Sequence, residues 1–249
     1  MIRAVIIDDE RNSQDIIRLI LQRYRPDVEI LGCGDSCSSA ISLIGQYRPD
    51  LVFLDLEMSD GTGFDVLTSL ENLDFELIFI TAHEKRFLQA IRFAEIEVIL
   101  KPVDKEILCE AMVRASLRIE NRAETGRYRI LLENVREGGR YQIVLPTLED
   151  LQSVSLDDII WLEQGDESTL FHLNGKSSVS AQRPFRYYTE LFGSLRFFQV
   201  TNSRMINLRF LKRPLTPGNA LFLVDGTLLE ISPRKKNELQ EFLKNESTL

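Results

Sequence analysis

The chain has 249 residues, 44% of them hydrophobic, and its 30 basic and 38 acidic side chains give a formal net charge of −8. This length is enough for two ordinary domains, and the hydrophobic content excludes wholesale disorder. No apolar run approaches the ~20 residues of a membrane-spanning helix, and the N-terminus MIRAVIIDDE turns acidic too early for a signal peptide. We therefore expect a cytoplasmic protein that contacts no membrane.

The first 122 residues predict an α/β domain. Runs of apolar residues, many of them β-branched, occupy 4–7, 29–33, 51–54, 77–80 and 97–100. Continuous runs of this kind are typical of strands that are covered on both faces in a parallel sheet. The segments between and after them (13–24, 38–47, 64–73, 85–96 and 105–119) have helical spacing, with Asp104 placed to cap the last. Five strand–helix units predict a doubly wound five-stranded parallel sheet, with its functional site at the carboxyl ends of the strands.

The pattern changes after residue 122. Residues 123–142 are polar and contain glycine, and we interpret them as a linker with room for a short strand or helix. Beyond them, eight short β-type runs are separated by polar or glycine-bearing turns, which favours an antiparallel sheet or barrel-like domain over 143–249. Segments 185–193 and 234–245 are expected to be its short helices.

The net charge is unevenly distributed along the chain. Residues 1–122 carry 22 acidic and 14 basic side chains, whereas residues 183–236 carry 10 basic and 3 acidic ones. An acidic half joined to a half with a basic stretch suggests two tasks, one of them involving a polyanion. The alternative is that the basic stretch is only a solvated face. The three cysteines, Cys33, Cys37 and Cys109, form no CxxC pair, and we expect reduced thiols rather than a disulfide or a metal site.

Polar residues follow four of the predicted strands of the first domain. Asp8 and Asp9 follow the first strand, Asp55 the third, Thr81 the fourth and Lys101 the fifth. Carboxylates that converge at one sheet edge repel each other unless a cation joins them, and Mg²⁺ prefers such oxygen ligands. With Mg²⁺ and Lys101 opposing the charge, a carboxylate can attack a phosphoryl group and form an aspartyl phosphate, while a hydroxyl such as that of Thr81 stabilises the transferring oxygens.

The segments IIDDE, LDLEMSDGTGFDVL, ITAH and LKP stand in the order found in the receiver domains of two-component systems, and residues 1–122 resemble that family. The resemblance implies phosphorylation of Asp55 by a sensor histidine kinase, homodimerisation through the receiver, contacts from Thr81 and Lys101 to the phosphoryl group, and a cis peptide before Pro102. It also implies a Mg²⁺ site made by Asp8, Asp9, Asp55 and the backbone carbonyl of Glu57.

Two positions depart from the receiver pattern. Ser59 stands where many receivers have proline, and Val98 stands where a switch aromatic normally lies. In the family this ring rotates into the space that the threonine leaves when it moves toward the phosphate. A valine has no ring that could rotate into this space. We therefore hypothesise that the receiver switches by another route, or weakly.

Residues 143–245 resemble the LytTR family of DNA-binding domains, through LDDIIWLEQGDESTLFHL, FFQVTNSRMINLRFL and LEISPRKKNELQEFL. The resemblance implies base reading by Thr169, Asn202 and Arg234, and from their charge we assign phosphate contacts to Arg204, Lys235 and Lys236. Trp161 is expected in the core, with Ser203 and Asn207 as structural supports. Asp166 and Glu167 place negative charge in a loop expected to face DNA, and Thr201–Asn202 replaces a pair that is often His-Arg or His-Lys.

The whole chain thus predicts a transcriptional regulator that binds double-stranded DNA under phosphorylation control, and not an enzyme. Only His83 and His172 are present, so no histidine-based metal site or triad is assembled in the second half. The alternatives are a receiver that drives a catalytic or RNA-binding output, and a protein-interaction module whose basic stretch meets an acidic partner. A steep salt dependence with sequence preference for duplex DNA would distinguish the first reading from these.

Overall fold

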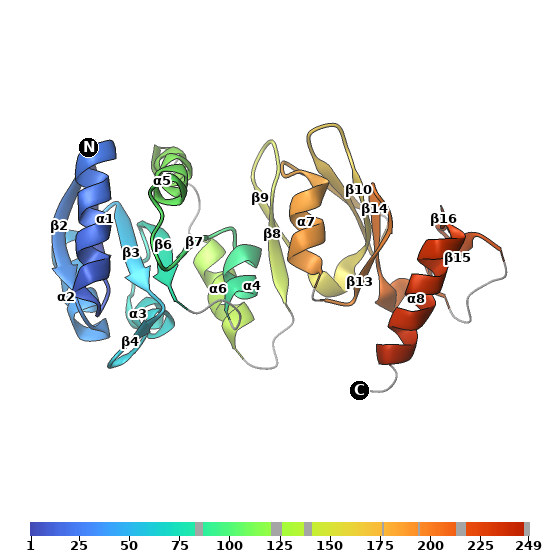
Figure 1. The fold of residues 1–249 in the computed structure, drawn as a ribbon, viewed down its shortest axis with the longest axis horizontal. Helices are drawn as coiled ribbons and strands as arrows, with labels where there is room; N and C mark the ends of the chain where they lie inside the picture. The colour runs from blue at the N-terminus through green and yellow to red at the C-terminus, as the bar shows by residue number, and fades with distance from the viewer. Residues whose placement is uncertain are drawn as a thin grey trace. The chain divides into compact units, whose positions relative to one another are not determined.

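The computed structural model describes residues 1–82, 87–120, 126–136, 141–175, 177–193, 195–212 and 218–246, without the side chains of residues 245 and 246. The chain divides into two compact units, Met1–Gly139 and Arg140–Leu249 (Figure 1). Within the described ranges, no helix is long and apolar enough to cross a membrane.

The first unit is built on a five-stranded parallel sheet, which confirms the predicted doubly wound fold. The strands are β1 (Ile2–Ile7), β2 (Val28–Gly34), β3 (Leu51–Asp55), β6 (Glu76–Thr81) and β7 (Glu97–Leu100), in the order β2-β1-β3-β6-β7. The helices between and after them are α1 (Arg11–Tyr24), α2 (Cys37–Tyr47), α3 (Gly63–Ser69), α4 (Leu88–Phe93) and α5 (Lys105–Glu120). The strand order reverses between β1 and β3, and ligand sites in such sheets lie at the carboxyl ends of the strands beside this point.

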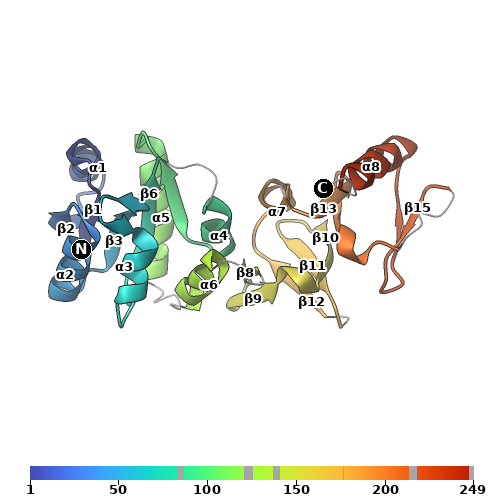
Figure 2. The same ribbon diagram turned by 90° about the horizontal axis from the view of Figure 1, so that it is seen from below.

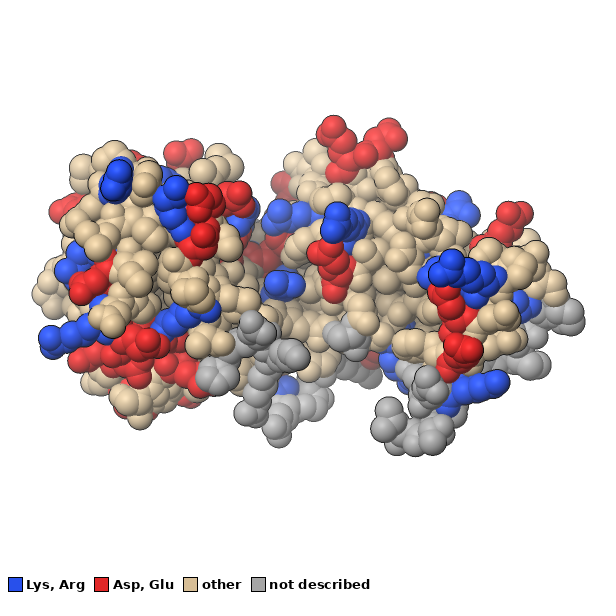
Figure 3. Space-filling view, viewed as in Figure 1, with Lys and Arg blue, Asp and Glu red and all other residues tan. Residues whose placement is uncertain are grey.

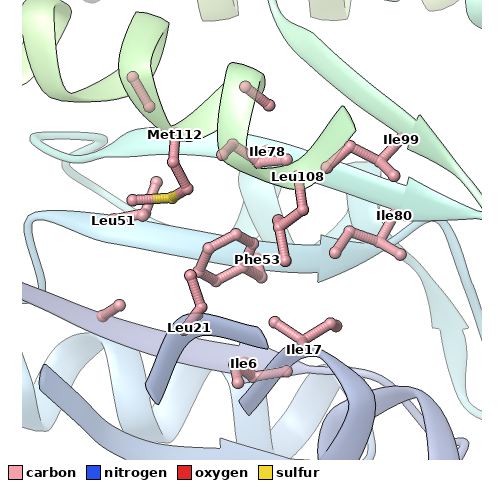
Figure 4. Packing of buried hydrophobic residues seen from close by; sticks show 13 residues of the cluster. Ile6, Ile17, Leu21, Leu51, Phe53, Ile78, Ile80, Ile99, Leu108 and Met112 are labelled. Carbon is pink, nitrogen blue, oxygen red and sulfur yellow. The ribbon is translucent and has the colours of Figure 1, made fainter. Parts of the chain in front are cut away.

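Alternate residues of each strand pack on opposite faces of the sheet. Ile6, Phe53 and Ile80 face α1 and α5, where Ile17 and Met112 join the same fully buried cluster (Figure 4). On the other face the ring of Phe64 in α3 lies 5.6 Å from that of Phe79 in β6. Each fully buried side chain of this size contributes roughly 1.5–3 kcal/mol, so the two layers of helices fix the sheet rigidly.

A short hairpin connects β3 to α3. It consists of β4 (Glu57–Met58) and β5 (Gly61–Thr62), and Thr62 caps α3 by accepting a hydrogen bond from the backbone of Asp65. Gly63 lies directly against β3, because a Cβ atom there would come 2.8 Å from the carbonyl oxygen of Asp55. Glycine therefore allows α3 to begin close behind Asp55.

Helix α6 (Gly126–Val135) falls in the segment 123–142, where a linker was expected. It belongs to the first unit, with contacts to α3 and α4. The predicted domain limits at 122 and 143 stay a prediction, but α6 is a packed helix and not an extended connection.

The second unit contains an antiparallel five-stranded sheet, as the spacing of β-type runs predicted. Its strands are β10 (Ile159–Gln164), β11 (Thr169–Leu173), β12 (Ser178–Ala181), β13 (Phe197–Thr201) and β14 (Arg204–Asn207), in the order β12-β11-β10-β14-β13. Two hairpins accompany it, β8 (Gln142–Pro146) with β9 (Leu151–Ser155) and β15 (Ala220–Phe222) with β16 (Leu228–Glu230). Strand β9 was not predicted, because LQSVS has few apolar residues.

Two helices cover this sheet. The rings of Tyr188 and Phe192 in α7 (Phe185–Phe192) meet Phe171 of β11 edge to face. Helix α8 (Pro233–Glu246) contributes Leu239 to a second buried cluster with Trp161 and Ile206. The hairpin β15–β16 lies beside α8 in both ribbon views (Figures 1 and 2). Both helices match the expected segments 185–193 and 234–245 within a few residues.

Candidate functional site

Four of the predicted polar residues meet at the carboxyl ends of the parallel strands. Asp55 ends β3 and is 4% exposed, and Asp8 follows β1 and is 1% exposed. Thr81 ends β6 with its side chain fully buried, and Lys101 follows β7. We call Asp8, Asp9, Glu10, Asp55, Thr81 and Lys101 the acidic site. Figure 3 shows Asp and Glu side chains gathered at the edge of the first unit where Figure 1 places β4.

Lys101 is the cation at the centre of the acidic site. Its Nζ lies 2.7 Å from Asp55 Oδ2, 3.0 Å from Asp8 Oδ1 and 3.0 Å from Glu10 Oε1. Burial works against the charge of Lys101, but the hydrogen bonds to Asp55, Asp8 and Glu10 outweigh it and raise its pKa above the usual value. Lys101 is therefore a permanent positive charge that can hold an anion at Asp55.

A group of residues that the sequence analysis did not single out fixes the position of Asp8. Ser13 donates its hydroxyl to Asp8 Oδ2 at 2.5 Å, and the backbone amide of Glu10 donates to Oδ1 at 2.9 Å. The side-chain amide of Gln14 donates to the carbonyl oxygens of Asp8 and Gly34. Ser13 and Gln14 lie in the first turn of α1, so the start of this helix orients the carboxylate.

The Asp55 carboxylate is partly desolvated and borders a cavity. Burial raises the pKa of Asp55, while the hydrogen bond from Lys101 works in the opposite direction. The backbone amide of Glu57 donates to Asp55 Oδ1 at 3.2 Å. A cavity of about 330 Å³ is lined by Asp9, Glu10, Asp55, Glu57, Met58, Ser59, Ala82 and Lys101. The Asp55 carboxylate thus borders a space for a small anionic group while its protein partners hold it in place.

The donors of the acidic site fit a divalent cation. Asp8, Asp9, Glu10 and Asp55 each offer a carboxylate oxygen, and these oxygens lie within 4.8 Å of one another. Three of these carboxylates share the ammonium of Lys101, so the site has an excess of negative charge that a hard cation with oxygen ligands would balance. Glu10 was not among the expected ligands, although it directly follows Asp8 and Asp9 in the sequence.

The two positions of the expected switch lie on neighbouring strands. Thr81 pairs with Leu100 across β6 and β7, and its carbonyl oxygen accepts a hydrogen bond from the amide of Lys101 at 2.8 Å. Val98 pairs with Phe79 and is half-buried at the edge of the sheet. The peptide bond between Lys101 and Pro102 is cis, as the receiver resemblance implied.

In the second unit, four side chains form a cluster on one face of the sheet. The rings of Trp161 and His172 are stacked, with centroids 3.8 Å apart. One carboxylate oxygen of Glu163 accepts a hydrogen bond from Arg204 Nε at 3.2 Å, and the other lies 3.2 Å from His172 Nε2. The Arg204 guanidinium lies 5.8 Å from the Trp161 ring centroid. Arg204, an expected phosphate contact, is therefore held in place by an acid and an aromatic ring, and Trp161 is buried as predicted.

The expected base-reading residues differ in exposure. Thr169 is fully buried and donates its hydroxyl to the carbonyl oxygen of Arg183 at 2.8 Å, so its assignment as a DNA contact is wrong. It opens β11, where the inward face of the sheet takes the side chain out of solvent. Asn202 is exposed in the turn between β13 and β14, as a contact residue must be. Asn207 is a structural support, since its amide donates to the carbonyl oxygens of Leu156 and Ile159.

The basic residues at the start of α8 are partly neutralised within the helix. Arg234 is 91% exposed and pairs with Glu238, which also pairs with Lys235. Lys235 lies 5.7 Å from the ring centroid of Phe198 in β13, and Lys236 donates to the carbonyl oxygen of Gly218. Figure 3 shows Lys and Arg side chains over α8 beside acidic ones. Exposed pairs of this kind are worth little, so these cations can exchange their partners.

Comparison with known proteins shows which families the chain resembles. Residues 4–113 match the response regulator receiver domain. The sensory transduction protein LytT of Bacillus cereus is 26% identical over 98% of this chain and 100% of its own length. LytT of Bacillus subtilis is 24% identical over 98% of this chain and 99% of its own. The transcriptional regulatory protein BtsR of Escherichia coli is 32% identical over 46% of this chain and 48% of its own.

The receiver match begins within β1, covers every described strand and helix from α1 to β7, and ends about halfway along α5, so it includes the acidic site. The similarity to LytT continues through the second unit. The chain is therefore similar to response regulator receiver domains over residues 4–113 and to the LytT proteins over nearly its whole length.

Proposed function

We propose that the chain is a transcriptional regulator of a two-component system, in which phosphorylation of Asp55 controls the binding of double-stranded DNA by the second unit. The observation that carries the proposal is the geometry at Asp55. Its carboxylate borders a cavity, and a permanently charged lysine lies 2.7 Å away. A sensor histidine kinase would supply the phosphoryl group, and the regulator would act in the cytoplasm, where kinase and DNA are both accessible.

The proposed chemistry is the transfer of a phosphoryl group from a phosphohistidine to the carboxylate of Asp55. An oxygen of Asp55 attacks the phosphorus of a phosphohistidine, a P–O bond forms, the P–N bond breaks, and the histidine leaves with its electron pair. Lys101 exchanges its contact with Asp55 Oδ2 for one with a phosphoryl oxygen, and the Thr81 hydroxyl donates to another. Asp8, Asp9, Asp55 and the Glu57 carbonyl would hold Mg²⁺, with Glu10 close by. When bound, Mg²⁺ neutralises the carboxylates and the transferring oxygens.

The proposed output is supported by the LytTR resemblance and by the charge of the second unit. Asn202 and Arg234 are exposed, Arg204 is half-exposed, and basic residues outnumber acidic ones over 183–236. The relatives include a protein named as a transcriptional regulator. We propose that Asn202 and Arg234 read bases and that Arg204, Lys235 and Lys236 contact phosphates. A receiver homodimer would then let two output units bind paired DNA sites with a gain in effective concentration.

The acceptor function is tested by incubating the full chain with Mg²⁺ and a small acyl phosphate donor, followed by mass spectrometry. The proposal predicts a mass increase of one phosphoryl group that is removed by hydroxylamine, because an acyl phosphate reacts with this nucleophile. Asp55→Asn should show no increase, whereas Asp60→Asn, an exposed aspartate of the neighbouring hairpin that caps the start of α2, should be phosphorylated normally. Phosphorylation of Asp55→Asn to the same extent as the unaltered chain would contradict it.

A further inference from the structure

Helix α6 is anchored to the first unit through a buried arginine. Arg127 is 3% exposed and donates hydrogen bonds to Glu76 Oε2 at 2.7 Å and to the carbonyl oxygen of Glu95 at 2.9 Å. Glu76 opens β6, and Glu95 lies in the turn that leads into β7. Arg127 therefore contacts the amino ends of two strands whose carboxyl ends carry Thr81 and lead to Lys101.

The rest of the α6 contact is apolar. Tyr128 is 1% exposed and donates its hydroxyl to the carbonyl oxygen of Phe75 at 2.6 Å, with the two rings 6.1 Å apart. Ile130 and Leu131 are also buried, whereas Arg129 on the opposite face is 77% exposed. The docked face of α6 is thus a short amphipathic surface with one charged anchor.

The anchor belongs to a network of ion pairs. Glu76 also forms an ion pair with Arg118 of α5 at 2.8 Å, and Arg118 forms a second ion pair with Glu97 of β7 at 2.7 Å. Loss of one member of a buried pair leaves an uncompensated charge, so such networks tend to be either fully formed or broken. The docking of α6 is therefore tied to the positions of β6, β7 and α5.

Helix α4 is the second connection between α6 and the acidic site. It follows β6, contacts α6 and contains only six residues. Its N-cap residue is Phe87, whose side chain makes no capping hydrogen bond. A helix this short is unstable alone, so its position depends on what it packs against. A displacement of Thr81 at the end of β6 would reach α6 through α4.

We propose that α6 is a strap that is docked when Asp55 is unmodified and released when Asp55 is phosphorylated. The proposal rests on the acceptor function of Asp55 stated above. Binding of the phosphoryl group at Thr81 and Lys101 draws the end of β6 toward Asp55, moves α4, and removes the surface on which α6 packs. Because α6 ends at Val135 and β8 begins at Gln142, release lengthens the tether of the second unit. Phosphorylation shifts this equilibrium only by its preference for one of the two states.

Hydrogen–deuterium exchange of the full chain, followed by mass spectrometry, tests this strap directly. We expect Mg²⁺ plus a beryllofluoride phosphoryl mimic to accelerate exchange at the amides of residues 130–135 about tenfold, because a docked helix exchanges through local opening. Arg127→Gln should exchange fast at these amides without the mimic, while amides of β1 and β3 stay protected. Arg129→Gln is the matched control, two residues along the same helix, and should behave like the unaltered chain.

The outcomes separate the strap from the acceptor function. Protection of amides around Asp55 and Lys101 by the mimic, with α6 unchanged or slower, would overturn the strap and leave Asp55 as the acceptor. No response at either place would contradict the acceptor function and the strap with it. Unchanged α6 exchange in Arg127→Gln would show that this arginine does not hold the helix, and would also overturn the proposal.

Discussion

The decisive interaction at the residue scale is the sharing of one lysine by several carboxylates. Lys101 lies within 3.0 Å of oxygens from Asp8, Glu10 and Asp55, so each acid is only partly compensated. Such an arrangement is costly in the resting protein and favourable once more cationic charge arrives. We therefore expect the site to be less stable than a neutral version of itself and to respond strongly to a divalent cation.

Replacement of the acceptor tests this cost. Asp55→Asn should raise the free energy of unfolding at neutral pH by about 1 kcal/mol, a usual size for one substitution, because it removes a desolvated negative charge and keeps an oxygen for Lys101. Mg²⁺ at about 100 times its Kd should add about 2.7 kcal/mol to the unaltered chain and clearly less to Asp55→Asn. Urea denaturation measures both, and a variant less stable than the unaltered chain would contradict the electrostatic account.

Cys37 provides a pH-dependent test at the same scale. Burial, together with the neighbouring Asp60 and Asp65, raises the pKa of the Cys37 thiol to about 11. The thiolate is the reactive form, so alkylation of native protein at pH 8 should spare Cys37 and speed up as the pH rises toward 11. Peptide mapping after iodoacetamide treatment measures this, with urea-unfolded protein as the control that labels all three cysteines. Rapid labelling of native Cys37 at pH 8 would disagree with its burial.

The residues of the acidic site show what a sequence can predict and what it cannot. Asp8, Asp55, Thr81 and Lys101 were predicted to meet because the carboxyl ends of parallel strands lie at one edge, and the structure confirms this convergence. Ser13 and Gln14 were not found, because their contacts depend on how α1 begins after β1. The functional roles of Asp8, Asp55, Thr81 and Lys101 stay predictions.

At the element scale, ion pairs connect the amino ends of β6 and β7 with α5. Burial works to raise the pKa of Glu97, but the hydrogen bonds from Arg114 and Arg118 outweigh it and lower the pKa. A lowered pKa in the folded state means that Glu97 stabilises the protein above its unfolded-state pKa, and that this contribution is lost as pH falls through the folded-state pKa.

Glu97→Gln should therefore destabilise the chain by about 3 kcal/mol at pH 7, the size expected when one partner of a buried pair is removed. The difference from the unaltered chain should shrink as the pH falls from 4.5 through the lower folded-state pKa, below which Glu97 is protonated in both states. Glu110→Gln is the control, because Glu110 also faces Arg114 but is 73% exposed and 3.9 Å away. Equal effects of the two substitutions in denaturation curves would refute the role of burial.

At this scale, Arg234 at the start of α8 provides a test of the proposed DNA contacts. Arg234 is 91% exposed and pairs with Glu238 four residues later, and Arg186 of α7 is 88% exposed and pairs with Glu190 in the same way. Arg234→Ala should weaken duplex binding and lower the slope of log affinity against log salt by about one if Arg234 meets a phosphate, or relax the sequence preference if it reads a base. Arg186→Ala should change neither. Equal effects of both would mean that only overall charge matters.

The features that could not be predicted from the sequence are those that depend on tertiary packing and not on the local sequence pattern. The polar composition of 123–142 suggested a linker with room for a short strand or helix, but not that Arg127 and Tyr128 would bury α6 against the first unit. Thr169 was assigned to a DNA-facing loop, but it opens β11 and points into the unit. Propensity describes a segment alone, and neither the partner of α6 nor the inward face of β11 can be read from the segment itself.

At the scale of the whole molecule, the chain joins an acidic unit similar to receiver domains to a unit with a basic stretch, and the similarity to LytT proteins extends over both. The predicted fold class of each half is confirmed, with parallel strands in the first unit and antiparallel ones in the second. The coupling between them could not be predicted from motifs, because Val98 replaces the usual aromatic and α6 has no sequence signature. Coupling must be measured on the full chain.

The measurement that tests the central claim most directly is duplex-DNA binding by the full chain, over a broad sequence pool, with and without Mg²⁺ and beryllofluoride and beside Asp55→Ala. The account predicts that binding tightens only when the mimic and Asp55 are both present. Equal binding in every condition would contradict phosphorylation control and leave a constitutive DNA-binding protein. No duplex binding in any condition at low salt would contradict the transcriptional function itself.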